Sequence, residues 1–432
     1  MESWTSPTVP SLPALPPTLR LHDTATGRLA DVEPRDGVGS LYVCGITPYD
    51  ATHLGHANTY VNFDLLVRYW HACGLEVQYV QNVTDVDDPL FERAAATGTD
   101  WRELGEEQTE LFRRDMAALG VIAPDVFRGA AESVPEVVAD VERLVEAGIG
   151  YRVPVPESER VDAADGDDVY FDIAAAEAAT DWRLGSIGAY DRAAMEELFP
   201  ERGGDPQRAG KRDALDPLLW SARRAGEPWW EGGALGPGRP GWHIECSVIS
   251  RRHLPAPFTV QGGGSDLRFP HHEFSAAHAT AADGVPLAET YVHTGMVGLR
   301  GEKMSKSQGN LVLVSALRAD GVDPQAVRVL LLSHHHRSDW SFTDEELAAS
   351  GERLQRWKDA LAEAPQPARG GDADKEPEDL QHALHSTLSQ DLNAPAALEQ
   401  LDRWAAGQLA AGTDAARVAD VVQALLGIDL RA

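Results

Sequence analysis

The sequence predicts an α/β protein with a parallel, doubly wound sheet of the Rossmann type, a helical insertion and a C-terminal helical domain. First, strand-like apolar runs alternate with helical periodicity between residues 39 and 310, which favours a parallel sheet. Second, the stretch LYVCGITPYDATHLGH at 41–56 passes from an apolar run through turn residues into a helical pattern. Third, residues 311–432 show mainly helical periodicity.

The first part of the chain predicts a short N-terminal domain. Residues 1–38 begin as a polar, proline-rich arm and continue into LRLHDTATGRL, which fits a small β element. The core starts with the strand that ends at Cys44 and continues with a helix ending near Gly74. A second strand over 75–85 follows, and its spacing from the first is typical of a strand–helix–strand unit.

Residues 39–310 are predicted as the core domain, interrupted by an insertion at about 101–240. The insertion is expected to be helical over 101–148 and to consist mainly of loops with short strand-like pieces over 151–240. The core then resumes with a helix in GWHIECSVISRRHL, a strand and glycine turn in FTVQGGGSDLRF, and a helix opened by Pro270.

The last part of the chain, residues 311–432, is predicted as a separate helical domain. A stretch rich in Pro, Gly and charged residues at about 364–380 is expected to be an exposed linker within it. The chain shows no internal repeats.

The composition excludes several classes of protein. No run approaches the roughly 18 apolar residues of a membrane span, and the first residues lack the basic flank of a signal peptide. Three cysteines are too few for a disulfide framework. We therefore expect a cytoplasmic protein of two or three domains that does not associate with membranes.

The charge argues against a nucleic-acid partner. The 38 basic and 68 acidic side chains give a formal net charge of −30, and only five of the basic residues are lysines. Affinity for a phosphate backbone depends on lysine and arginine. A tRNA partner is therefore unlikely on composition, although a local basic patch is compatible with an acidic chain.

Two short motifs indicate phosphate chemistry. His53 and His56 in HLGH fall at a predicted helix start, where free amides and the helix dipole favour anions. Taken alone, HLGH is more typical of a partly exposed helix start. KMSKS follows at 303–307, however, and HLGH and KMSKS in this order are the signatures of class I aminoacyl-tRNA synthetases and their relatives. Glycines on both sides of KMSKS are expected to let this loop close over a nucleotide.

A wider set of motifs resembles the cysteinyl-tRNA synthetase family. The motifs are CGITPYD, HLGH, NVTDVDD, GPGRPGWHIECS, GGGSDLRFPHHE and KMSKSQGN, and they occur in the family's order over most of the chain. The resemblance implies a zinc ion that binds the thiol of a cysteine substrate, with Cys44, Cys246 and His271 as its ligands. Without the resemblance, the three residues would be interpreted as two buried thiols and a helix-start histidine, because zinc-finger spacing rules do not apply to ligands this far apart.

Two departures separate this chain from the synthetases. Ser275 stands where the synthetase pattern has a glutamate that is a fourth ligand to zinc, and the chain ends soon after the helices that follow KMSKS. These features, together with CGITPYDATHLGHANTY and ERGGDP at 201–206, resemble the cysteine ligases of the mycothiol pathway. A zinc site with three protein ligands leaves one position for a substrate.

The resemblance implies an ATP-dependent, amide-forming ligase that releases AMP and pyrophosphate. Its substrates would be L-cysteine, ATP with Mg²⁺, and glucosaminyl-inositol (GlcN-Ins), and its product Cys-GlcN-Ins would form through a cysteinyl-adenylate. His53, His56, Lys303 and Lys306 are the predicted catalytic residues, because positioning and charge stabilisation dominate such displacements. The residues implied for the adenylate are Cys44, Gly45, Ile46, Thr47, Thr59, Asn82, Val83, Thr84, Trp242, Gly264, Ser265, Asp266 and Val297.

The zinc ion implied by the resemblance would also explain why the substrate is cysteine and not serine. A zinc-bound thiolate is favoured over the harder, less acidic hydroxyl of serine, whereas pocket size alone discriminates weakly. Trp242, one helical turn before Cys246, either walls this pocket or packs in the core.

Three functions remain open on the sequence: the small-molecule ligase, a shortened cysteinyl-tRNA synthetase, and a non-enzymatic paralogue that binds RNA or an adenylate. We expect a monomer. Two further groups are interpreted as structural: the histidines at 334–336 as a loop, and at least two of Asp85, Asp87 and Asp88 as helix-capping or solvated residues.

Overall fold

The computed structural model describes residues 1–50, 52–162, 165–304, 309–363, 380–408 and 415–431. Its centre is a five-stranded sheet with the order β11-β10-β3-β4-β5. Every neighbouring pair in this sheet is parallel, which confirms the predicted sheet. Its strands are β3 (Val38–Val43), β4 (Glu76–Val83), β5 (Val126–Gly129), β10 (Phe258–Gly264) and β11 (Ala288–Thr294).

The strand order reverses between β3 and β10. From β3 the chain passes through α1 (Leu54–Ala72) to β4 on one side, and from β10 it passes through α8 (His271–Asp283) to β11 on the other. In open α/β sheets ligands bind in the crevice at the carboxyl ends of the strands where the order reverses. The segments that begin at Cys44 and Ser265 both leave the sheet at this point.

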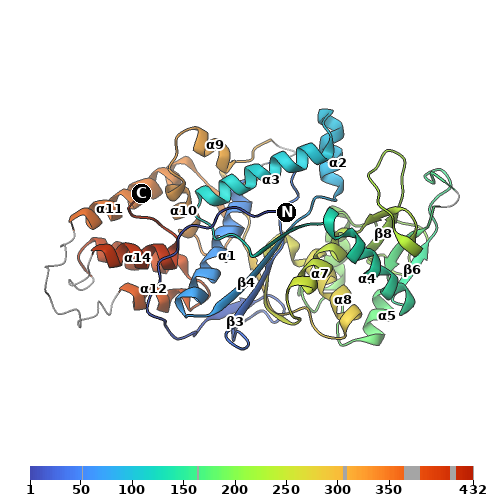
Figure 1. Ribbon diagram of the computed structural model, residues 1–432, viewed down its shortest axis with the longest axis horizontal. Coiled ribbons are helices and arrows are strands. Elements are labelled where there is room, and N and C mark those ends of the chain that lie inside the picture. Colours follow the sequence, from blue (N-terminus) through green and yellow to red (C-terminus); the bar gives the residue numbers. More distant parts are fainter. Residues whose placement is uncertain (51, 163–164, 305–308, 364–379, 409–414, 432) are drawn as a thin grey trace.

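The two faces of β3 belong to different cores. Leu41 and Val43 pack in the core that contains α1, whereas Tyr42 and Cys44 pack with residues of α7 (Trp242–His253) and α8. This alternation is the two-residue period of a strand buried on both sides. Figure 1 accordingly shows α1 on one side of β3 and β4 and the pair α7 and α8 on the other.

The insertion differs from its prediction. Helices α3 (Trp101–Ala118) and α4 (Val134–Glu146) lie where helices were expected, but β5 lies between them and pairs with β4 in the central sheet. A four-residue strand is too short to break a helical pattern visibly. The insertion is therefore not helical over the whole of 101–148.

Residues 151–240 consist mainly of loops and turns with short strands, as expected, but the pairing of these strands was not foreseen. They contain most of a four-stranded antiparallel sheet of β6 (Gly150–Val153), β7 (Asp168–Phe171), β8 (Leu218–Ala222) and β9 (Gly238–Pro240). Each strand has three to five residues and the connections are long, so the two-residue alternation rarely extends far enough to be recognised. The helices among these strands are α5 (Ile173–Ala179) and α6 (Arg192–Glu201).

The N-terminal arm is packed on the core. Its predicted β element is the hairpin of β1 (Arg20–Asp23) and β2 (Arg28–Asp31). Trp4 is buried, its ring meets Phe112 and Phe127 edge-on at 5.6 and 5.8 Å, and its Nε1 donates to the carbonyl of Val121 at 2.8 Å.

The C-terminal residues are mainly helical, as predicted. The helices are α9 (Val314–Ala319), α10 (Pro324–Leu332), α11 (Asp344–Glu363), α12 (Leu380–Leu388), α13 (Ala394–Ala405) and α14 (Ala415–Leu426). A small sheet of β13 (Glu302–Lys303), β12 (Val297–Leu299) and β14 (Trp340–Phe342) joins this region to the core. The predicted linker at 364–380 lies outside the described residues, except for Leu380. Among the described residues no helix has the length and apolar character needed to span a bilayer.

A buried ion cluster fixes α1 against the C-terminal helices. Asp64 pairs with Arg68 at 2.7 Å and with Arg328, and all three side chains are almost fully buried. Both arginines also donate to backbone carbonyls, among them those of Gln423 and Leu426 at 2.7 Å. Burial raises the pKa of a carboxyl group, but the two arginines outweigh it and lower the pKa of Asp64.

Asp64→Asn is expected to lower the free energy of unfolding by about 3–5 kcal/mol, because it leaves two buried guanidinium groups without a counter-charge. Urea denaturation followed by circular dichroism measures this loss. Glu110→Gln is the control, since Glu110 makes exposed pairs with Arg113 and Arg114 and should change stability by less than about 1 kcal/mol. Equal effects of the two substitutions would contradict the role of the cluster.

Candidate active site

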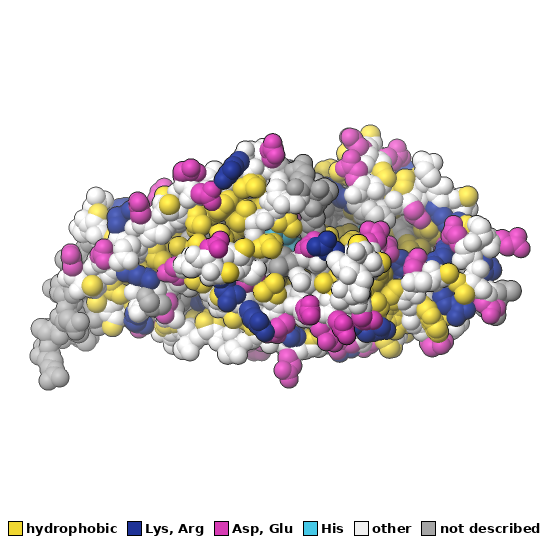
Figure 2. Space-filling model, turned by 90° about the horizontal axis from the view of Figure 1, so that it is seen from above, with side chains coloured by type: hydrophobic (Ala, Val, Ile, Leu, Met, Phe, Trp, Pro, Cys, Tyr) yellow, Lys and Arg dark blue, Asp and Glu magenta, His cyan; other side chains and the backbone are white. Residues whose placement is uncertain are grey.

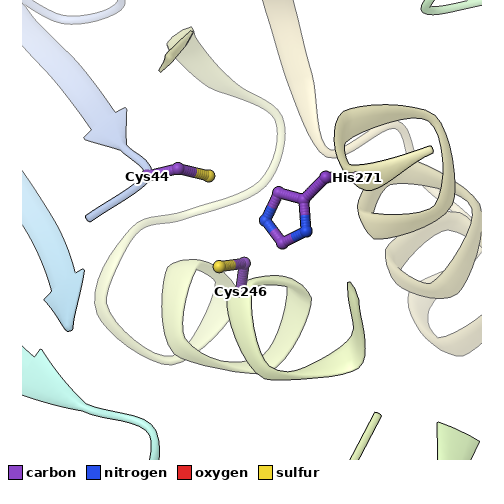
Figure 3. Close-up of side chains that lie close together, drawn as sticks. All are labelled: Cys44, Cys246 and His271. Carbon is purple, nitrogen blue, oxygen red and sulfur yellow. The ribbon is translucent and has the colours of Figure 1, made fainter. Parts of the chain in front are cut away.

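Three side chains from separate elements meet at the point where the strand order reverses. Cys44 follows β3, Cys246 lies on α7 and His271 begins α8; their ligand atoms lie within 4.8 Å of one another and all three residues are buried. Figure 3 shows the imidazole ring of His271 pointing toward the two sulfur atoms. Ligands of a tetrahedral zinc lie about 3.3–3.8 Å apart, so these donors fit zinc with small side-chain adjustments.

The orientation of His271 is set by its neighbours. Its Nδ1 lies 3.1 Å from Nδ1 of His243, and the Trp242 ring stacks on the His271 ring at 4.3 Å. Burial lowers the pKa of His243 to about 3 and that of His271 well below its usual value. Both rings are therefore neutral, one donates to the other, and a neutral imidazole is the form that binds a metal. Stacking on His271 also places Trp242 beside the cluster.

A chain of hydrogen bonds leads away from Cys44. Its Sγ lies 3.2 Å from Nε2 of His272, whose Nδ1 lies 2.7 Å from Nε2 of His293. Nδ1 of His293 lies 2.7 Å from the hydroxyl of Thr24, beyond β1. Burial raises the pKa of the Cys44 thiol, so a bound metal ion would be needed to hold it as a thiolate. No sequence pattern predicted these hydrogen bonds, because the residues that form them come from distant segments.

Ser275 does not point to the cluster as a ligand. Its hydroxyl is buried and donates to the carbonyl of His243 at 3.1 Å. Among the described residues the group is formed by Cys44, Cys246 and His271 without it. This arrangement suits the expectation of three protein ligands, which stays a prediction.

A second group of donors consists of His335, His336 and Asp391. Asp391 already accepts from Nε of Arg337 at 2.6 Å and from the backbone amide of His22 at 2.8 Å. His336 lies 3.3 Å from the same carboxylate. These contacts join three segments of the chain and favour the structural interpretation of the histidines at 334–336.

The HLGH motif forms the beginning of α1. His53 is the N-cap residue, and its Nδ1 accepts from the amides of Gly55 at 3.1 Å and His56 at 3.4 Å. The rings of His53 and His56 stack at 3.8 Å. Both therefore lie at the positive end of the helix, as predicted. Lys303 ends β13, but its side chain and the whole of Lys306 lie outside the described residues.

Most of the residues expected to contact an adenylate come from the carboxyl-terminal edge of the central sheet. Gly45, Ile46 and Thr47 follow β3, and Val43 is level with Gln81 of β4 and Gly262 of β10. The remaining residues lie near strand ends or helix starts: Asn82, Val83 and Thr84 at the end of β4, Gly264, Ser265 and Asp266 at the end of β10, Trp242 at the start of α7, Val297 at the start of β12 and Thr59 in α1. Their binding role stays a prediction.

Polar contacts hold several of these residues. Oδ1 of Asn82 accepts from the amide of Gly45 at 2.8 Å and from the hydroxyl of Tyr42 at 2.9 Å. The hydroxyls of Thr59 and Thr294 lie 2.8 Å apart. Asp87, the N-cap of α2 (Asp88–Thr97), accepts from the amide of Asp88 at 3.0 Å, which agrees with the predicted capping role. Its other carboxylate oxygen accepts from the hydroxyl of Thr47 at 3.0 Å.

The ERGGDP segment at 201–206 reaches the same edge. Arg202 donates to the carbonyl of Asp266 at 2.6 Å and to the carbonyl of Phe269. Asp205 anchors the segment in the insertion through Lys211 at 2.9 Å and the hydroxyl of Tyr170. The segment therefore fastens the insertion to the turn between Gly264 and His271. The ERGGDP motif supported the family resemblance, but the sequence did not predict the contacts that this segment makes.

Comparison with known proteins first identifies the broad class to which the catalytic domain belongs. The family described as "tRNA synthetases class I (C) catalytic domain" matches residues 32–352. Two solved structures share the fold at low identity. A methionyl-tRNA synthetase of Mycobacterium tuberculosis with methionyl-adenylate has a TM-score of 0.59 at 19% identity, covering 91% of this chain and 88% of its own. A leucyl-tRNA synthetase ternary complex of Agrobacterium radiobacter has a TM-score of 0.60 at 13% identity, with 92% and 85% covered.

Curated relatives narrow the class. A protein of Micrococcus luteus named L-cysteine:1D-myo-inositol 2-amino-2-deoxy-alpha-D-glucopyranoside ligase is 62% identical over 435 residues, and the match covers 100% of both chains. A protein of the same name from Kocuria rhizophila is 56% identical, also over 100% of both chains. The chain belongs to this family of cysteine ligases within the class I synthetase fold. The predicted resemblance is confirmed.

Cys246→Ala is expected to abolish zinc binding, because it removes one of two sulfur ligands from a three-ligand group. Metal analysis of the dialysed protein should give about one zinc ion per chain for the unaltered protein and close to none for the variant. Cys73→Ala is the matched control, since Cys73 is a buried thiol on the far end of α1. Equal zinc content in all three proteins would show that the cluster is not the site.

Proposed function

We propose that the chain joins the carboxyl group of L-cysteine to the amine of 1D-myo-inositol 2-amino-2-deoxy-α-D-glucopyranoside (GlcN-Ins) in an amide bond, at the expense of ATP. The observation that carries this proposal is full-length identity of 62% to a ligase of that name. The class I catalytic domain over 32–352 supports ATP as the activating substrate. The product, Cys-GlcN-Ins, belongs to mycothiol biosynthesis.

The reaction has two steps in this proposal. An oxygen of the cysteine carboxylate attacks the α-phosphorus of ATP, and pyrophosphate leaves with the electrons of the broken P–O bond. The amine of GlcN-Ins then attacks the carbonyl carbon of the cysteinyl-adenylate, AMP leaves, and the amine loses a proton. Because both steps develop charge on oxygens, residues that hold phosphates in place contribute most.

The chain's own residues fit these steps at the reversal of strand order. His53 and His56, stacked at the positive end of α1, suit the stabilisation of phosphate oxygens, and Lys303 and Lys306 would complete that set together with Mg²⁺. The adenylate would lie across the ends of β3, β4 and β10. The predicted domain division, with the catalytic domain at 39–310 and its insertion at about 101–240, accords with a catalytic centre built from both halves of the sheet.

Cys44, Cys246 and His271 would hold zinc, which when bound supplies a Lewis acid that favours the thiolate of the substrate over a hydroxyl. Trp242 would wall this pocket from its place on the His271 ring. The free state of all three cysteines suits the reducing cytoplasm, where we place the enzyme as a monomer.

The acceptor of the activated cysteine distinguishes the ligase from a tRNA synthetase. Purified protein with cysteine and ATP should yield Cys-GlcN-Ins when GlcN-Ins is added and no charged tRNA when cysteine-specific tRNA is added, with mass spectrometry and acid-precipitable radioactivity as the two readouts. Pyrophosphate exchange in the absence of any acceptor confirms the first step. Charged tRNA without the amide would instead establish a shortened cysteinyl-tRNA synthetase, and the absence of any exchange would favour a non-enzymatic paralogue.

Arg202→Ala is expected to reduce cysteine-dependent pyrophosphate exchange about tenfold or more, because a guanidinium that holds two carbonyls of the 264–271 turn typically contributes about 1.5–3 kcal/mol. Arg202→Lys should recover part of the loss. Arg192→Ala is the control, since Arg192 is a half-exposed residue of α6 that pairs with the exposed Glu196 and with Asp213. If Arg202→Ala changed neither kcat nor the KM values for ATP and cysteine, Arg202 would have no role in positioning the 264–271 turn.

A further inference from the structure

An open groove lies between the corner of α2 and α3 and the connection from β8 to β9. It has a volume of about 530 Å³ and is lined by aromatic and polar side chains, a size typical of small-molecule sites. Figure 2 shows the face seen from above, which is hollowed in the right-hand half of the molecule, where α2 and β8 lie in Figure 1. Its lining includes Phe91, Trp101 and Trp229.

The aromatic rings of the groove are held in place. Trp101 meets Phe91 edge-on at 5.3 Å, and the guanidinium of Arg102 lies 4.3 Å from the Trp101 ring centre. Trp229 is 43% exposed, and Arg223 lies 5.1 Å from its ring centre. Rigid aromatic faces that remain open to solvent are suited to a ligand with an apolar face and polar edges.

The polar lining is acidic and hydroxylic. Asp100, Thr99 and Glu227 line the groove beside the rings, with Arg102 as the one basic residue among the described lining residues. Asp88 lies close by, since Arg239 binds both Asp88 at 2.5 Å and Glu227 at 3.3 Å. Hydroxyl and amine groups find acceptors here, whereas phosphate groups meet carboxylates.

Helix α2 runs from the candidate active site to the groove. Asp87, which accepts from Thr47 at 3.0 Å, is the N-cap of α2, and Phe91, which lines the groove, lies four residues further along, a rise of about 6 Å. Arg239, which binds Glu227 of the groove at 3.3 Å, precedes Trp242 by three residues. The groove and the candidate active site are therefore built on neighbouring parts of the same segments.

We propose that this groove binds the inositol end of the GlcN-Ins acceptor, a proposal that rests on the function proposed above. The ring faces of the cyclitol lie against Trp229 and Trp101, its hydroxyls bond to Asp100 and Glu227, and the glucosamine amine points toward Thr47. The acceptor is a hydroxyl-rich molecule of two linked rings with a single amine, which matches the aromatic faces and the acidic lining of the groove. An RNA acceptor end would bring phosphates to these carboxylates.

Trp229→Ala tests the proposal, because the exposed side chain can be removed without opening the core. The KM for GlcN-Ins in amide formation is expected to rise about tenfold, the effect of one lost aromatic contact. Cysteine-dependent pyrophosphate exchange, which needs no acceptor, should stay within about twofold. Trp229→Phe should restore most of the affinity. Val285→Ala removes another exposed apolar side chain and should change neither measurement.

Binding of GlcN-Ins to the unaltered protein, measured by calorimetry, separates the two proposals. If GlcN-Ins binds and is consumed, but Trp229→Ala and Trp101→Ala leave its KM unchanged, the groove proposal is overturned and the function stands. If GlcN-Ins neither binds nor reacts while pyrophosphate exchange proceeds, both fail. Loss of tRNA charging in Trp229→Ala would assign the groove to RNA and overturn the proposal as well.

Discussion

The carbonyl oxygen of Asn82 occupies the space that a side chain at residue 45 would need: a Cβ atom on Gly45 would lie 1.5 Å from it. Only glycine allows the chain leaving β3 to pass this close to β4. The approach also lets Oδ1 of Asn82 accept from the Gly45 amide. Cys44 is thereby held at the carboxyl end of the sheet with its thiol toward α7 and α8, and the remaining groups of the site are placed around it.

The residues of the candidate site lie on both faces of β3. Cys44 belongs to the face covered by α7 and α8, which contribute Cys246 and His271, so the donors for a metal lie on one side of the sheet. His53 and His56 belong to α1 on the other side. The buried Asp64 lies in the middle of this helix and ties it to Arg328 of α10. The position of the N-terminal end of α1, where His53 and His56 lie, therefore depends on ion pairs made in the middle of the helix.

The sequence patterns predicted those structural features that depend on residues close together in the chain. The parallel sheet, the helix start at HLGH and the capping by Asp87 follow from local periodicity and turn residues. Cys44 and Cys246 are far apart in the chain, so only the family resemblance joined them to His271. The bonds from His272 through His293 to Thr24 depend on how the β1–β2 hairpin meets β11, where the Thr24 amide donates to the carbonyl of Tyr291. No local pattern carries that information. The pairing of β6 to β9 into one sheet could not be predicted, because these strands are short and pair across long connections.

Several arginines of the insertion are already paired with carboxylates of the same chain, which bears on the kind of acceptor that this region can bind. Arg208 and Arg224 both bind the nearly buried carboxylate of Asp168, at 2.8 and 2.9 Å, and Arg223 binds Asp165 at 2.9 Å. Arg239 is shared between Asp88 and Glu227. To bind a phosphate backbone, such guanidinium groups would first have to leave carboxylates inside their own chain, and those carboxylates would then repel the phosphates. A neutral or cationic acceptor would leave these pairs intact, so the ion pairs of the insertion are better suited to such an acceptor than to a phosphate backbone.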